Sequence, residues 1–121
     1  MVTSKLKDRV VWMIVEGKLL ADEFIPEAEQ WLSRLDEYDG YCTDVRKMTT
    51  STAVDKKRIE ERRKQNATGK ASAILVKDSF WWTLAKIYIN FTQASDTQIF
   101  TDPEKAKAWI QGYRNRKEAM G

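Results

Sequence analysis

Short apolar runs alternate with amphipathic segments along this chain, and that order is typical of an α/β fold. The run at 10–15 is β-branched and aromatic and is followed by Gly17, and the run at 71–76 ends before Asp78. Both runs are too short for helices and suit strands that are covered on both faces. Weaker strand patterns lie at 3–6, 41–48 and 97–100. We therefore expect a single four- to five-stranded sheet, mixed or mostly parallel, in which 3–6 and 10–15 form a hairpin.

About four helices fit between and after these strands. Helical spacing or capping signals occur after Gly17 as far as 36–40, at 52–65, at 79–91 and at 102–113. The start of the last helix is clear, because Asp102 stands at the cap position and Pro103 at the first helical position. Asp22 is the expected cap of the first helix and Thr52 that of the second. The polar segment 113–121 is expected to fray.

The chain of 121 residues, of which 42% are hydrophobic, is the size of one domain with one core. We assign to this core Ile14, Leu32, Ile74, Leu75, Val76, Leu84 and Trp109, which lie on the apolar faces of their elements. The segment 56–65 has Ile59 as its only large apolar residue. We therefore expect this helix to be an outer element and the most mobile one.

The segment 79–91 is apolar over more than one side of its helix. The sheet can cover one stripe, which contains Phe80, Leu84, Ile87, Tyr88 and Phe91. The same sheet cannot cover a second flank, which contains Trp81, Trp82, Ala85 and Ile89. A helix that is apolar over more than one stripe needs a second surface. A neighbouring helix, a second subunit and a bound apolar ligand can each supply that surface.

Composition and charge exclude several classes of protein. The chain has no histidine, which removes Ser-His and Cys-His nucleophile pairs and most zinc sites. Its 21 basic and 18 acidic residues are interleaved and give a net charge of +3, so we expect no nucleic-acid partner. No window approaches the roughly 18 apolar residues that span a bilayer, and no signal core follows the N-terminus. Since Cys42 is the one cysteine, we expect a cytoplasmic protein without an internal disulfide.

Three aspartates at expected strand ends are the candidates for acid-base or metal chemistry, namely Asp44, Asp78 and Asp102. Three carboxylates can in principle form a metal site or supply a general base. Each of them is explained more simply as a turn or helix cap. We therefore expect that the protein is not an enzyme and that it uses no metal and no cofactor.

Two motifs connect the chain to a known family. The closing segment has Phe100, Thr101 and Asp102 at a strand end, followed by a helix with Ala106 or Ala108, Trp109 and Ile110. The segment 17–24, with Pro26 behind it, looks like a strand-to-helix junction of the same family. In order and spacing these motifs resemble the SpoIIAA-like family, which is related to STAS domains and is also described as CRAL-TRIO-like. The resemblance covers about residues 5–112 and implies helices packed on a four- or five-stranded sheet, with a non-enzymatic regulatory or ligand-binding role.

The resemblance also implies a position for a phosphorylation switch. The related anti-anti-sigma proteins are phosphorylated on a serine that opens the helix after the strand carrying an Asp. The positional counterparts in this chain lie after Asp44, at Thr50 and Ser51. The chain lacks the Asp-Ser-Ser-Gly type motif of those proteins, and the simpler interpretation is that the hydroxyls of 49–52 cap the second helix.

Two functions remain open. The first is a small binding module, forming a homodimer or holding another protein, that acts through the strand ends and the aromatic helix. The second is a carrier of an apolar or lipid-like molecule, lined by aromatic residues of 79–91, with Arg46 or Lys77 meeting an anionic head group. Asp44 and Arg46 are included in the expected surface because they lie near the carboxyl end of the expected strand 41–48. Ligands of open α/β sheets bind at such ends, where the strand order reverses. The expected ligand or partner surface contains Asp44, Arg46, Trp81, Trp82, Tyr88 and Ile89.

Overall fold

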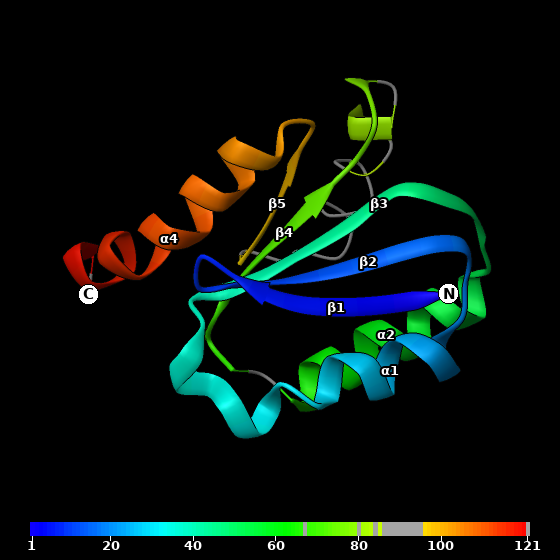
Figure 1. The fold of residues 1–121 in the computed structure, drawn as a ribbon, viewed down its shortest axis with the longest axis horizontal. Coiled ribbons are helices and arrows are strands. Elements are labelled where there is room, and N and C mark those ends of the chain that lie inside the picture. The colour runs from blue at the N-terminus through cyan, green and yellow to red at the C-terminus, as the bar shows by residue number, and fades with distance from the viewer. Residues whose placement is uncertain (67, 80, 84, 86–95, 121) are drawn as a thin grey trace.

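The chain forms a five-stranded mixed sheet whose strands lie side by side in chain order (Figure 1). The computed structural model describes residues 1–66, 68–79, 81–83, 85 and 96–120. The strand β1 (Val2–Lys7) pairs antiparallel with β2 (Val10–Leu19), which confirms the predicted hairpin. The strands β3 (Gly40–Ser51), β4 (Ala71–Leu75) and β5 (Thr97–Phe100) extend the sheet in parallel. The expected mixed, mostly parallel sheet is therefore confirmed.

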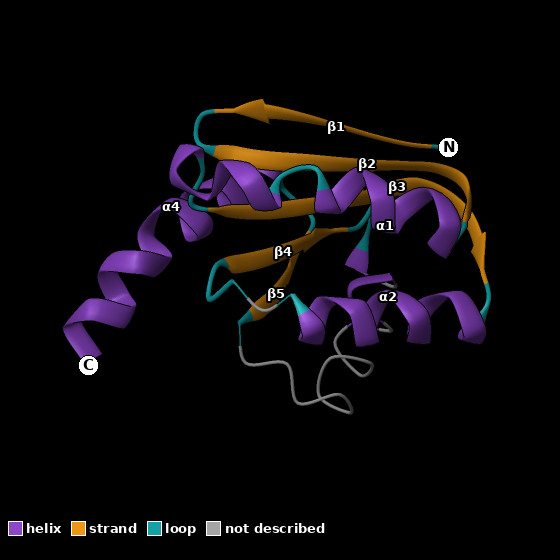
Figure 2. Cartoon of the chain, turned by 90° about the horizontal axis from the view of Figure 1, so that it is seen from below, coloured by secondary structure: helices purple, strands orange, loops and turns teal. Residues whose placement is uncertain are grey.

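Helices cover both faces of this sheet. The helix α1 (Ala21–Glu29) connects β2 to β3, and α2 (Ala53–Gln65) connects β3 to β4. Crossovers between parallel strands are right-handed, and β3 and β4 are each added on the same side of the preceding strand. Both helices therefore lie on one face of the sheet (Figures 1 and 2). The helix α4 (Pro103–Met120) follows β5 and lies on the opposite face. The order of the described strands never reverses, so these strands form no switch point, and a binding site at Asp44 and Arg46 stays a prediction.

The core occupies both faces because side chains alternate along each strand. On the α1 face, Val11 and Met13 of β2 pack against Trp31 and Tyr38. On the α4 face, the helix closes over a cluster that contains Val10, Cys42, Ala71, Ala73, Leu75, Ala106 and Ile110. The alternation of β2 therefore places neighbouring residues in two separate clusters.

Part of the predicted core is correct. Leu75 and Val76 are buried, whereas Ile14, Leu32, Ile74 and Trp109 are only half-buried, and Leu84 lies outside the described residues. Trp109 packs at the margin of its cluster, against the rings of Phe100 and Tyr113. The side chains that are fully buried and large include Tyr38, Met13 and Ile110. The apolar stripes therefore predicted more complete burial than Ile14, Leu32, Ile74 and Trp109 have.

The predicted first helix is divided into two parts. The helix α1 ends at Glu29, and a separate 3-10 helix, η1 (Leu32–Glu37), follows it. Asp22 does not cap α1, because Leu20 occupies the cap position and Asp22 lies within the first turn of the helix. The N–H of Ala21 donates instead to the carboxylate of Asp55 on α2, at 2.9 Å. A contact from a distant element has replaced the local cap that the sequence predicted.

Several elements are longer than predicted. The strand β2 continues through Gly17, which has a φ of +71°, and its added length pairs with that of β3 as far as Ser51. The helix α4 continues past Tyr113 to Met120, and the fraying of 113–121 stays a prediction. Among the described residues, no helix is long and apolar enough to cross a membrane.

We expect the backbone amides of α2 to exchange with solvent before those of α4. No side chain of α2 is buried, whereas Ala106 and Ile110 of α4 are fully buried. Exposed ion pairs such as Arg58 with Asp22 add only about 0–1 kcal/mol each, so opening α2 costs little free energy. Hydrogen exchange followed by mass spectrometry measures the difference. Equal protection of the two helices would contradict this prediction.

Candidate functional site

The parallel strands end at one edge of the sheet, and the segment after β4 starts a helical turn there (Figure 1). At this edge, the N–H of Val76, just after β4, donates to the carbonyl of Phe100 at the end of β5, at 2.9 Å. Asp78 then caps the turn. Its carboxylate accepts the N–H of Trp81 at 3.1 Å, and its carbonyl accepts that of Trp82 at 3.0 Å. The two tryptophans are thereby held at the carboxyl edge of the sheet.

Both indoles are large apolar side chains that remain exposed. Trp81 keeps 40% and Trp82 39% of its surface accessible to solvent. The indole N–H of Trp82 donates to the carbonyl of Ile99 at 3.2 Å, which holds this ring beside β5. The ring of Trp81 lies under the amine of Lys77, at 5.5 Å from the ring centroid. Ala85, which was predicted to share their flank, instead packs against the cluster that contains Ile99.

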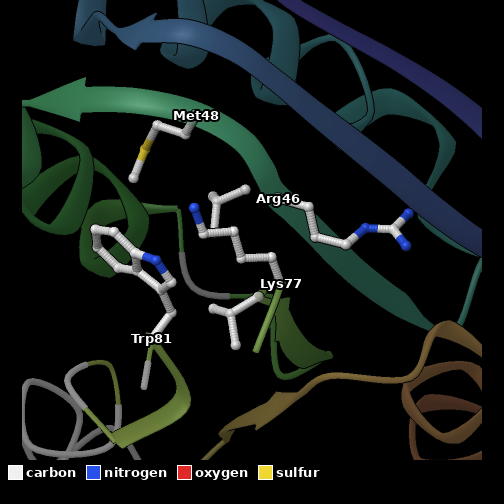
Figure 3. Close-up of a pocket in the computed structure, with 6 residues that line it drawn as sticks. Arg46, Met48, Lys77 and Trp81 are labelled. Atoms are coloured by element: carbon white, nitrogen blue, oxygen red, sulfur yellow. The ribbon is translucent and has the colours of Figure 1, made fainter. Parts of the chain in front are cut away.

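A shallow hollow lies beside Trp81 (Figure 3). Its lining consists of Val45, Arg46, Met48, Val76, Lys77 and Trp81. The side chain of Lys77 extends toward Met48 and Trp81. The volume of the hollow is about 20 Å³, which is room for about one water molecule. Sequence reasoning named Lys77 and Trp81 but missed the apolar floor, although alternation along 41–48 could have placed Val45 on this side.

Arg46 contributes to the lining of this hollow, but its guanidinium is directed away from it and binds Asp44. The side chain of Arg46 donates to both carboxylate oxygens of Asp44, at 3.0 and 2.8 Å, and its backbone N–H donates at 3.0 Å. Figure 3 shows the guanidinium of Arg46 pointing away from Trp81. Residues two apart on a strand share a face, so Asp44 lies on the face opposite to Val45. The structure therefore does not bring Asp44 to Trp81, and Tyr88 and Ile89 lie outside the described residues.

The three aspartates that sequence reasoning considered for catalysis all make structural contacts. Burial raises the pKa of Asp44, but the hydrogen bonds from the side chain and backbone of Arg46 outweigh it and hold that pKa below its ordinary value. Asp102 accepts the N–H of Glu104 at 2.9 Å and so caps α4, as Asp78 caps its own turn. Within the described part of the chain, no three acidic or cysteine side chains gather as metal ligands do. The simpler interpretation of each aspartate is therefore sufficient.

The hydroxyls at the end of β3 have different roles. Thr50 and Ser51 belong to the strand and pair with Lys18 and Leu19 of β2. Only Thr52 caps α2, since its hydroxyl accepts the N–H of Asp55 at 3.1 Å and donates to the Asp55 carboxylate at 2.6 Å. Thr50 is exposed and Ser51 is half-buried. Phosphorylation at Thr50 or Ser51 stays a prediction.

The architecture is similar to that of solved structures of low sequence identity. An uncharacterized protein of the DUF3478 family with a SpoIIAA-like fold, from Shewanella loihica PV-4, is 12% identical and has a TM-score of 0.67, over 91% of this chain and 92% of that chain. The anti-sigma factor antagonist SpoIIAA in its unphosphorylated form is 11% identical and has a TM-score of 0.64, over 94% of this chain and 98% of that chain. The sequence matches no protein-family model and no curated protein.

These similarities define the class of the fold. The chain has a SpoIIAA-like α/β fold, as the motifs at 17–24 and 100–110 implied. At identities of 11% and 12%, the similarity establishes the architecture and leaves the activity to be inferred from the site.

Proposed function

We propose that this protein is a small, non-enzymatic regulatory module of the cytoplasm that acts through protein-protein contacts. One observation carries the proposal, namely that Trp81 and Trp82 stand next to each other and keep 40% and 39% of their surface exposed. Covering the exposed part of each indole contributes about 2 kcal/mol, at roughly 25 cal/mol per Å² of apolar area. Tryptophan is also among the residues that most often dominate the binding energy of protein interfaces. A protein partner, either a second copy of this chain or another protein, gains from covering this pair.

Two further observations support this proposal. The SpoIIAA structure that resembles this chain is that of an anti-sigma factor antagonist, a regulatory protein. Cys42 is a free, buried cysteine, which is in keeping with a reducing compartment such as the cytoplasm. The contacts that occupy Asp44, Asp78 and Asp102 favour a role without catalysis.

The alternative function is a carrier or sensor of a lipid-like molecule beside the segment 79–91. Pockets that enclose such ligands have volumes of roughly 300–1,000 Å³. The hollow beside Trp81 has a volume of about 20 Å³, and Arg46 is held by Asp44 rather than directed into it. The dimensions of this hollow favour a surface contact over an enclosed ligand.

A photo-crosslinking experiment tests the proposed function. A benzoylphenylalanine placed at Thr83, an exposed position that follows Trp82 in the sequence, is expected to crosslink to a protein in the cells that produce this chain. The same group at Val54, which is 69% exposed on α2 and does not line the hollow, is the matched control. Trp81→Gln should weaken the partner contact by about thirtyfold, because interface tryptophans often contribute 2 kcal/mol or more.

The variants also separate the proposed function from its alternative. Trp81→Gln should lower the melting temperature less than replacement of a fully buried core residue, since the indole keeps 40% of its surface exposed. Crosslinks that are equal at positions 83 and 54 and that persist in Trp81→Gln contradict the protein-contact surface. Crosslinks to lipid alone, together with a lipid retained in native mass spectrometry, support the carrier instead.

A further inference from the structure

The amine of Lys77 lies where a partner would contact Trp81. Its nitrogen is 5.5 Å from the centroid of the indole, and its side chain extends across the hollow toward Met48 and Trp81 (Figure 3). A lysine over an exposed ring gains a modest cation-π attraction, which a stronger partner for the amine can replace. Lys77 therefore joins a positive charge to an apolar surface at one small site.

The neighbouring charges are already neutralised. Arg46 binds Asp44 with a shortest distance of 2.8 Å, and Lys47 lies 4.0 Å from Glu16. In contrast, no carboxylate of the described residues lies within 4.0 Å of the Lys77 amine. Within this part of the structure, no carboxylate therefore competes with another molecule for the Lys77 amine.

From this arrangement we propose the chemistry of the partner. The surface formed by Trp81 and Lys77 at the edge of the hollow binds a segment of a partner protein in which an aspartate or glutamate stands beside a large apolar side chain. The carboxylate binds the Lys77 amine, and the apolar side chain covers the exposed part of the Trp81 indole beside the hollow. Complementary charge selects the partner, while burial of the indole supplies most of the affinity. This inference rests on the proposed function, since it names the partner of the same surface.

An anionic membrane is a poorer match for this surface than an acidic protein segment. A bilayer presents many negative head groups and is held by several basic residues together. Of the two cations that line the hollow, Arg46 is paired with Asp44, which leaves Lys77. The indole N–H of Trp82 is also engaged by the carbonyl of Ile99, so this ring is held against the protein. Lys77 beside the indole of Trp81 offers one positive charge and one apolar surface. A protein segment with one carboxylate next to one apolar side chain is complementary to both.

Selection from a random peptide library displayed on phage tests this inference. Against the wild-type chain, we expect enrichment of peptides with Asp or Glu next to Leu, Ile, Phe or Trp. Against Lys77→Glu, the preference should change to Lys or Arg at the same position, and acidic peptides should lose about tenfold in affinity. Lys105→Glu, which changes an exposed lysine of α4 outside the hollow, should select the same acidic peptides as the wild type.

The outcomes distinguish this inference from the proposed function. If Trp81→Gln abolishes selection but Lys77→Glu does not change the charge preference, the protein-contact surface stands and the acidic partner is wrong. If Trp81→Gln selects the same peptides as the wild type, the surface itself is wrong. An absence of selected peptides also counts against the acidic segment. Binding of phosphatidylserine vesicles that is lost in both Trp81→Gln and Lys77→Glu, without peptide selection, overturns it in favour of a membrane.

Discussion

Replacing Gly40 with alanine is expected to destabilise the fold by about 3 kcal/mol. Gly40 is buried at the first position of β3, where α4 crosses the sheet. A Cβ atom at this position would lie 2.5 Å from the carbonyl oxygen of Ala71 and 2.7 Å from Cγ2 of Ile110. The carbonyl belongs to the neighbouring strand β4 and cannot move without disturbing the strand pairing. The added methyl group must therefore push α4 and β4 away from β3.

Gly17→Ala is the matched control for this experiment. Gly17 has a φ of +71°, but nothing lies within 4 Å of an added Cβ atom. Its replacement should cost only the backbone strain of an L-residue in the left-handed region, about 1 kcal/mol. Urea denaturation followed by circular dichroism measures both variants. A loss from Gly40→Ala that is no larger than that from Gly17→Ala would mean that α4 does not pack closely on this end of the sheet.

Tyr38→Ala is expected to cost about 4 kcal/mol, because it empties a large site in the core on the α1 face. Tyr38 has no exposed surface, and its ring meets the edge of Trp31 at a centroid distance of 6.2 Å. Its hydroxyl donates to the carbonyl of Trp31 at 2.9 Å and lies 2.6 Å from the hydroxyl of Tyr41. Tyr38→Phe keeps the ring and removes only these polar contacts, so it should cost about 1–2 kcal/mol. Equal losses from the two variants in urea melts would show that packing of the ring contributes nothing.

The same tyrosine pair predicts a loss of stability at alkaline pH. Burial, together with the contact to Tyr41, raises the pKa of Tyr38, and burial also raises the pKa of Tyr41. In the unfolded chain both groups titrate near a pKa of about 10. Their contribution to stability is therefore complete below pH ~10 and decreases above it, because the unfolded state releases protons that the folded state keeps. The decrease measured by denaturation across this range should be shallower in Tyr38→Phe, and identical slopes would contradict the assignment.

Gly40 and Tyr38 also show where sequence reasoning was insufficient. In the sequence, Gly40 reads as the end of a helix and Tyr38 as part of a polar connection. Their importance arises from partners far away in the chain, such as Ile110 for Gly40 and Lys70 for Tyr38, whose amine donates to the Tyr38 carbonyl at 2.9 Å. The cap of α1 has the same origin, because Asp55 takes the place that the sequence assigned to Asp22. A periodic pattern contains no information on which distant residue arrives at a given position.

The residues of the candidate site were also predictable only in part from the sequence. The apolar excess of the segment 79–91 drew attention to Trp81 and Trp82, since residues three and four apart share a helical stripe and these two lie outside it. Both indoles are partly exposed, and their role as a binding surface stays a prediction. The pairing of Asp44 with Arg46 was not predicted, although a spacing of two on a strand places both side chains on one face. Val45, which lies between them, lines the hollow beside Trp81, as part of Arg46 does. Which residues share the hollow was decided by the register of β3 against β4.

By itself, the sequence determined the strands, most helix starts and the fold class, because these depend on local spacing and capping. The spacing of apolar residues indicates a strand or a helix whichever elements pack against it. Thr52, Asp102 and Pro103 favour a helix start through contacts or backbone geometry within one helical turn. Only the tertiary structure decided which face each helix covers, how far α4 reaches over the sheet and which side chains surround Trp81. Those features depend on the direction of the crossovers and on contacts between residues far apart in sequence, such as Gly40 with Ile110.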